Sequence, residues 1–126
     1  MGITAQLSST AYSPDQLIAQ NSDDLLTRSV TLLTGTNYLR GALLGKITAS
    51  GKYTTSLAAA ADGSQIPDAI LVDDVNALSG DVVTPVYVRG DFQAQQVIYG
   101  AGHTTASVVD GLRLKNIYLL NNLGGV

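Results

Sequence analysis

The sequence contains no cysteine and no glutamate, and only one histidine among its 126 residues. Without cysteine the chain can form neither a disulfide framework nor a thiolate metal site, which is typical of proteins that fold in a reducing cytoplasm. A single histidine excludes metal motifs that are built on paired histidines. All ten acidic residues are Asp, which favours turns and caps over helix interiors. These absences favour loops between strands, and we expect no metal ion and no cofactor.

Charge is also scarce. Charged residues make up 13% of the chain, against roughly a quarter in a typical globular domain, whereas 22 residues are Ser or Thr. A hydroxyl-rich surface of this kind suits extensive contact with other proteins, because few charges must lose their water. The seven basic residues are scattered singly in a chain of net charge −3. This argues against direct nucleic-acid binding, which needs clustered Lys or Arg to displace counterions.

Long apolar runs are missing as well. No run approaches the ~20 residues that a helix needs to cross a bilayer, and Met1 to Gln6 lack the basic start and apolar core of a signal peptide. We therefore expect no membrane partner and no cleaved leader. A chain of 126 residues is long enough for one domain with a real core, but oligomerisation would add stability.

Residues 1–27 differ from the rest and are predicted to form an N-terminal arm. Its apolar residues, spread among Ser, Thr, Gln, Asn and Asp without a strand pattern, are Ile3, Leu7, Tyr12, Leu17 and Ile18. Ser13 to Gln16 places Ser as an N-cap and Pro at the first helical position, which predicts one or two helical turns through Gln20. Two interpretations stay open: a packed first turn of an ordinary domain, or a segment that orders only against a partner.

From Val30 onward the pattern changes to short strands separated by Gly-containing turns, which predicts a β-rich domain over residues 28–126. The expected hairpins are Val30–Leu33 with Tyr38–Leu39, and Leu43–Ala49 with Lys52–Leu57. Residues 58–65 are predicted to be a loop, and Ala69–Val72 and Val82–Val88 to be strands. Pro85 has no amide to donate, so we expect an edge strand there, a strand that starts after it, or a bulge.

The end of the chain adds one helix. Thr104 to Leu114 has apolar residues at three- and four-residue spacings behind a Thr cap, although Gly111 weakens its last turn. Gln95–Tyr99 is predicted to be a strand or a core-packed loop, and Ile117–Leu120 a closing strand. The sum is a mainly β fold with a minor α component: a small β-barrel or β-tulip-like domain with one short C-terminal helix.

Two similar segments, Leu39–Thr48 and Val86–Phe92, each place an Arg-Gly pair beside an apolar, β-prone run. Gly is favoured where a strand must bulge, bend or admit another backbone, so both segments suggest a closed sheet that turns corners. Arg40 and Arg89 could clamp an anion. Pairing with an Asp of the same or another subunit is the favoured interpretation, which makes both candidates for polar contacts between subunits.

The sequence offers weak candidates for chemistry. Gly100 to Ala106 has the glycines of a dinucleotide fingerprint, but the chain ends too soon for the second strand and acidic residue that this motif requires. His103 could act as a base, yet no nucleophile elbow accompanies it, so a loop or cap role is favoured. The acidic cluster of Asp73, Asp74, Asn76 and Asp81 lacks the Gly and Glu of a calcium loop. We expect no enzyme; the alternative is a small β-barrel ligand-binding or hydrolytic module that uses His103 and the Asp73–Asp81 loop.

Several segments, taken in order, resemble the head decoration protein family of tailed phages. The segments that carry the resemblance are Tyr12–Ala19, Thr27–Leu33, Arg40-Gly41 with Leu44–Ile47, Tyr87–Phe92 and the closing Ile117–Leu119. The resemblance implies a homotrimer that sits on local three-fold sites of the expanded capsid and cements it against the pressure of packaged DNA. It places the protein in the host cytoplasm before assembly and on the outer surface of the virion head afterwards.

The partners that the resemblance implies are the major capsid protein and other copies of this chain. In this interpretation Ile3, Leu7 and Tyr12 of the arm order on the major capsid protein, by adding backbone to a sheet edge there. Low charge, many hydroxyls and the lack of a catalytic motif agree with such a role.

Overall fold

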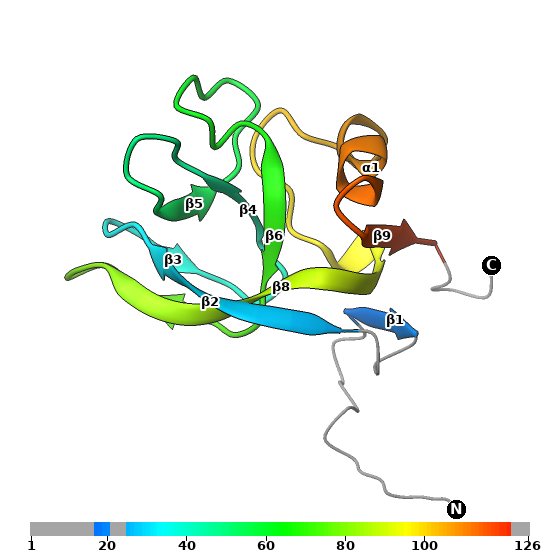
Figure 1. Cartoon of the computed structure of the whole chain (residues 1–126), viewed down its shortest axis with the longest axis horizontal. Coiled ribbons are helices and arrows are strands. Elements are labelled where there is room, and N and C mark those ends of the chain that lie inside the picture. Colours follow the sequence, from blue (N-terminus) through cyan, green and yellow to red (C-terminus); the bar gives the residue numbers. More distant parts are fainter. Residues whose placement is uncertain (1–16, 21–24, 122–126) are drawn as a thin grey trace, which may run out of the picture.

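A computed structural model describes residues 17–20 and 25–121 of the chain, which form a β-rich body (Figure 1). The strands are β1 (Ile18–Gln20), β2 (Leu26–Leu32), β3 (Asn37–Tyr38), β4 (Leu43–Lys46), β5 (Tyr53–Thr55), β6 (Pro67–Leu71), β7 (Val75–Asn76), β8 (Val82–Gln93) and β9 (Ile117–Leu120). A short 3₁₀-helix spans Ala94–Gln96, and the helix α1 spans Thr105–Arg113. The prediction of a mainly β fold with one short C-terminal helix is confirmed.

Strand β8 is the spine of the fold. Along one edge it pairs antiparallel with β2 and then with β1, from Leu32↔Val82 to Ile18↔Phe92. Along its other edge it pairs antiparallel with β6 and then parallel with β9. One 12-residue strand therefore joins the first, middle and last strands of the described chain.

Five strands close into a barrel, which confirms the predicted barrel. Each pairs with the next in the cycle β2, β5, β4, β6, β8 and back to β2. Closure removes most free edges, which would otherwise offer unpaired backbone groups to other chains. The pairing of β2 with β5 is the weak point of the cycle, because it is parallel and has a single register position, Leu32↔Tyr53.

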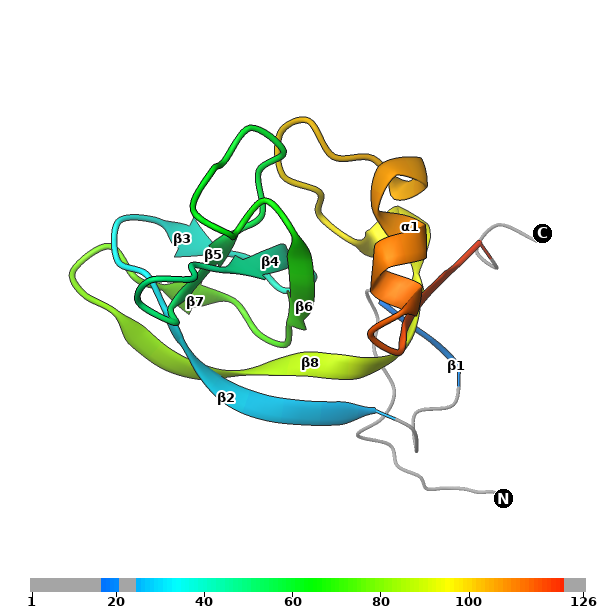
Figure 2. The ribbon, with the colours of Figure 1, turned by 45° about the horizontal axis from the view of Figure 1, so that its top comes forward.

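The core has two parts. One fills the barrel and includes Leu32, Leu44 and Leu71, all fully buried. The other lies under α1, where Val108 and Leu112 of the helix pack with Phe92 of β8. Figure 2 shows α1 standing beside the barrel, over the end of β8.

Local signals explain the start of α1. The Thr104 side chain accepts a hydrogen bond from the Ser107 backbone amide, and the Ser107 hydroxyl accepts one from the Thr104 amide. This reciprocal capping box satisfies two amides that the first helical turn leaves unpaired. The predicted helix and its Thr cap are confirmed.

The helix predicted through Gln20 is wrong at its end. Ile18–Gln20 is strand β1, because Ile18 pairs with Phe92 and the Leu17 carbonyl accepts a hydrogen bond from Gln93. Burial of Leu17 in the core and a free edge on β8 together outweigh a local cap signal. Ser13 to Gln16, where that signal lies, falls outside the described residues.

The first predicted hairpin is also wrong. Strand β3 pairs with β7, not with β2. The turn after β2 is bound by Ala77, whose carbonyl accepts hydrogen bonds from the Gly35 amide and the Thr34 hydroxyl. That attachment carries Tyr38 into the barrel core.

Several other predicted elements are confirmed. Strands β4 and β5 form the second hairpin, and residues 58–65 are a loop. Gln95 and Gln96 belong to the 3₁₀-helix, and residues 97–99 follow it and pack against the core with Val97 buried. Pro85 lies within β8 opposite Ser29, where only β2 pairs with that strand among the described residues, because β6 joins from Val86 onward. The spine is therefore a local edge at its proline, as one of the alternatives anticipated.

Candidate functional site

The predicted capsid-contact residues Ile3, Leu7 and Tyr12 lie outside the described residues. The structure shows the point at which the arm joins the body. Leu17 is 1% exposed, and β1 is fixed on the spine strand β8. Any segment before Leu17 starts at the end of the body that also holds β9.

Both Arg-Gly pairs lie where a neighbouring segment packs closely, against a backbone carbonyl at Gly41 and against side chains at Gly90. Gly41 and Gly90 have φ of +90° and +152°, which an L side chain rarely adopts. A Cβ at Gly41 would lie 3.0 Å from the Gln96 carbonyl oxygen, and one at Gly90 would lie 2.5 Å from a Leu25 methyl. Each glycine thus lets a neighbouring segment pack against the strand.

Arg40 is bound within its own chain. Its guanidinium donates to the Val72 carbonyl at 2.7 Å and to the Tyr87 hydroxyl at 3.3 Å, and its backbone amide donates to Asp74. These bonds tie the loop before β4 to the end of β6. A contact from Arg40 to another subunit would have to share a guanidinium that already has partners.

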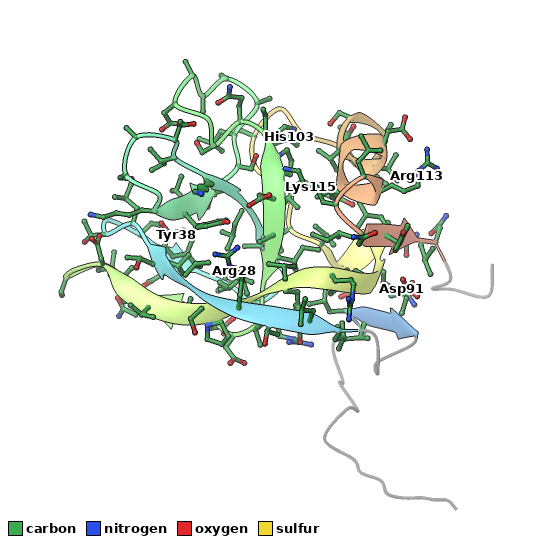
Figure 3. The ribbon with its side chains drawn as sticks, in the orientation of Figure 1. Arg28, Tyr38, Asp91, His103, Arg113 and Lys115 are labelled. Carbon is green, nitrogen blue, oxygen red and sulfur yellow. The ribbon has the colours of Figure 1, made fainter. Side chains whose placement is uncertain are left out.

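Arg89 has a more open setting on β8. It is exposed and lines a hollow of about 280 Å³ with Gly90, Asp91, Asn116 and Tyr118. Figure 3 shows Asp91 of this hollow between β9 and β1, at the end of the body away from β5. Both arginines remain predictions as contacts between subunits.

His103 and the Asp73–Asp81 loop are not brought together. His103 Nε2 lies 3.1 Å from the Ser56 hydroxyl and 3.1 Å from the carbonyl oxygen of Gln65, which comes just before β6. Asp73 follows the other end of β6. A five-residue strand spans about 17 Å, so the two halves of the alternative site lie at opposite ends of one strand.

The polar side chains of the Asp73–Asp81 loop instead accept hydrogen bonds from groups of the same chain. The Asn76 side chain accepts from the Leu78 amide, Asp74 from the Arg40 amide, and Asp81 from the Thr34 amide and from Lys52 at 2.7 Å. The hydrogen bond from Lys52, followed by that from Thr34, lowers the pKa of Asp81. Over residues 17–20 and 25–121 no three His, Cys, Asp or Glu side chains converge on a metal position.

A polar network at the weak seam of the barrel was not anticipated from the sequence. The buried Tyr53 of β5 donates its hydroxyl to Asp68 of β6 at 2.6 Å. Lys115, after α1, reaches the other oxygen of Asp68 at 3.0 Å and the Pro67 carbonyl at 3.0 Å. The network ties β5, β6 and the segment after α1 together where β2 leaves β5.

The network holds its carboxylate in the charged form. Burial alone would raise the pKa of Asp68, but hydrogen bonds from Tyr53 and Lys115 and the charges of Lys115 and Lys46 lower it overall. Burial, followed by the hydrogen bond to Asp68, raises the pKa of Tyr53 to about 12, against a partial opposing effect of Arg28. Asp68 therefore accepts from both partners as an anion.

Beside this network runs an apolar groove, which we define by Ile66, Pro67, Val108, Gly111, Leu112 and Leu114. It has a volume of about 430 Å³ and lies between α1 and the segment that leads into β6, with His103 at one end and Lys115 at the other. Ile66 is 57% exposed and Leu114 is 87% exposed. A second hollow of about 200 Å³ adjoins it, since it shares Ile66 and Lys115 and adds Lys46 and Asp68.

Comparison with known proteins identifies the family. In the part of the chain that the structure describes, no helix is long and apolar enough to cross a membrane. No curated protein matches the chain. The model of the family described as bacteriophage lambda head decoration protein D matches residues 6–113, which is 108 of 126 residues and spans the chain from the arm through α1. The chain belongs to the bacteriophage lambda head decoration protein D family.

Proposed function

We propose that the protein is a capsid decoration protein that binds as a homotrimer at local three-fold sites on the outer surface of the expanded phage head. It is made in the host cytoplasm, and once bound to the major capsid protein it stabilises the head against the pressure of packaged DNA. Membership of the decoration family, over most of the chain, carries this proposal.

The surface chemistry supports a role in protein contacts. Large apolar side chains are exposed around the body: Leu26, Leu39, Leu57, Ile66, Leu78, Val83, Ile98, Leu114 and Tyr118. Apolar side chains with few charges between them suit contacts with neighbouring subunits, because little charge must be desolvated when two surfaces meet.

The N-terminal arm supplies the main contact in this proposal. Ile3, Leu7 and Tyr12 order on the major capsid protein, where the arm adds backbone to a sheet edge. Strand β1 and the buried Leu17 anchor the arm to the body, so a bound arm holds the whole subunit. In a trimer, three arms act together, since the second and third bind at high effective concentration once the first is in place.

Arg89 is the better candidate of the two arginines for a contact between subunits. It is an exposed residue beside an open hollow, which leaves its side chain accessible to a neighbouring subunit.

Deletion of residues 1–12 tests the arm. The truncated protein should fold and form trimers, but it should not co-sediment with expanded heads, whereas the full chain should bind at about one copy per capsid subunit. Unexpanded heads should bind neither. Equal binding of the truncated and full chains would overturn the role of the arm.

A length-matched control separates the side chains from the tether. Ile3→Ser, Leu7→Ser and Tyr12→Ser in one variant keep the backbone but remove the apolar groups. If backbone pairing and apolar side chains both contribute, this variant should bind more weakly than the full chain and more strongly than the deletion.

A further inference from the structure

The basic residues differ in whether they form ion pairs with other residues of the described chain. Three basic residues, Lys52, Arg113 and Lys115, form ion pairs inside the chain. Arg28 of β2 and Lys46 of β4, by contrast, are exposed and make no ion pair or side-chain hydrogen bond with any residue in 17–20 or 25–121. On a chain of net charge −3, these two cations thus have no ion-pair partner within the part that the structure describes.

Lys46 lines the same hollow as Asp68, and Arg28 lies near Tyr53, whose hydroxyl donates to that carboxylate. The charge of Lys46 acts on Asp68, and the charge of Arg28 acts on Tyr53, which is hydrogen-bonded to Asp68. We call Arg28, Lys46 and Lys115 the basic face; Figure 3 labels Arg28 on β2 and Lys115 beside β6. Asp68 is already bound by Tyr53 and Lys115. Asp62, near the rim, turns its carboxylate to Ser64. Three cations therefore face two carboxylates, Asp68 and Asp62, and the basic face keeps a small excess of positive charge among the described residues.

The apolar groove continues this face. It shares Lys115 and Ile66 with the hollow that Lys46 lines, so a segment that left the groove through that hollow would reach Lys46. Ile66 and Leu114 border the groove with most of their side chains exposed to water. Apolar side chains beside unpaired cations match a partner that carries an apolar side chain next to a carboxylate.

Gly111 gives an independent reason to expect an occupant. It lies within α1 and lines the groove, and a glycine inside a helix is less favourable than an alanine. No packing inside the subunit requires it, because a Cβ built there meets no atom within 4 Å and its φ is not positive. A glycine at this point does leave room for another backbone to approach the helix.

One edge of β2 is largely unpaired among the described residues. Among the described residues, β2 pairs along its length with β8 on one edge, but on the other edge it meets β5 only at Leu32. Residues 26–31, which include Arg28, therefore offer an edge to which an extended segment can hydrogen-bond.

We propose that the basic face and the apolar groove together form a second docking surface, which takes an extended, carboxylate-bearing segment of the major capsid protein. An apolar side chain of that segment seats over Gly111 between Ile66 and Leu114, and its carboxylate pairs with Lys46 and Arg28. The surface rests on the proposed decoration function and adds a contact made by the body to the one made by the arm.

Two variants of the full chain test this surface through binding to expanded heads. Arg28→Glu with Lys46→Glu reverses the unpaired charges, and Gly111→Leu fills the groove without a change in charge. Neither change removes a hydrogen bond or ion pair among the described residues, so both proteins should fold. Each should lower affinity for heads at least tenfold. Arg113→Glu is the control, since Figure 3 shows Arg113 on the side of α1 away from His103 and Lys115, and it should bind within twofold of the wild type.

Salt gives a second readout. Binding of the wild type should weaken as ionic strength rises, because exposed charge pairs are screened, and a variant with Arg28→Gln and Lys46→Gln should lose most of that dependence.

The proposed docking surface is overturned if the deletion of residues 1–12 abolishes binding while the charge-reversed and Gly111→Leu variants bind like the wild type. That result would leave the decoration function intact. A failure of the wild type to bind heads would overturn the decoration function itself. A change in the number of subunits per oligomer in the charge-reversed variant would mean that the face contacts another copy of the chain. If the wild type binds DNA and the charge-reversed variant does not, the face is a nucleic-acid site. Either result overturns the proposal.

Discussion

The two edges of β2 differ sharply. On one edge β2 pairs with β8 from Leu26 to Leu32, while on the other it meets β5 at a single position. Backbone hydrogen bonds hold the first edge, and the side-chain network of Tyr53, Asp68 and Lys115 holds the region beside the second. The comparison indicates that the spine carries the stability of the body, and that the seam beside β5 is where the body has polar groups and open backbone for a partner.

Loss of the spine's largest fully buried side chain should have the largest effect. Phe92 of β8 is fully buried, and its ring lies 5.3 Å from that of Tyr87. Phe92→Ala should lower the free energy of unfolding by about 3–5 kcal/mol, because it removes apolar contacts and leaves a cavity. Urea unfolding at neutral pH measures this. Phe92→Leu should lower the free energy of unfolding by less. If Phe92→Ala lowers it by less than about 1 kcal/mol, β8 does not carry the stability of the body.

Loss of the seam's carboxylate should have a smaller effect that depends on pH. Asp68→Asn removes the charge that binds Lys115, and should cost about 1–2 kcal/mol at pH 7. Because the folded protein lowers the pKa of Asp68 from 3.8, this contribution is present above that value and is lost as the pH falls through the lower folded value. The difference in unfolding free energy between wild type and variant should therefore shrink in acid.

Asp110→Asn is the matched control for the seam. Asp110 pairs with Arg113 on the exposed side of α1, where an ion pair contributes little. A pH-independent difference for Asp68→Asn, or an equal effect in both variants, would contradict the role assigned to the network.

Stability at alkaline pH tests the contribution of the same network. The folded protein raises the pKa of Tyr53 to about 12 from 10.0, so its contribution is complete below 10 and is lost as the pH rises toward 12. Tyr53→Phe should be less stable than wild type by about 1 kcal/mol at pH 8, through loss of the hydrogen bond to Asp68, and the two curves should converge above pH 10. Tyr118→Phe serves as the control, because the Tyr118 side chain on β9 is exposed. A gap that stays constant to pH 12 would contradict this.

The smallest effect has the opposite sign. Gly111→Ala should stabilise the protein by about 0.5–1 kcal/mol, because alanine favours the helix and nothing in the subunit blocks its methyl group. Gly90→Ala should destabilise it, since that residue has a φ of +152° and a crowded Cβ position. Thermal unfolding of the pair separates a glycine that the fold needs from one that it does not. If both variants shift the unfolding temperature equally and in the same direction, Gly111 is no evidence for an occupant of the groove.

Local pattern predicted much of the fold. Alternation and turn residues predicted the β4–β5 hairpin, β6, β8 and β9, and the Thr cap predicted α1, because each depends on neighbours in the sequence. Strand β1 and the β3–β7 pair were missed, since their partners lie far along the chain and outweigh local signals.

The candidate site was less predictable for the same reason. The bonds of Asp68 join residues 15 and 47 positions apart, and no local spacing marks them. That Arg28 and Lys46 have no ion-pair partner among residues 17–20 and 25–121 emerges only from the folded arrangement of the described charges. The family resemblance, in contrast, depended on the order of short segments, and the family match over residues 6–113 confirms it.

Electron cryomicroscopy of expanded heads incubated with the full chain tests the central claim most directly. We expect density for three copies at each local three-fold site, with the arm on the major capsid protein and Arg28, Lys46 and the groove beside α1 turned toward the shell. Bare three-fold sites at saturating protein, or copies attached elsewhere on the head, would contradict the account.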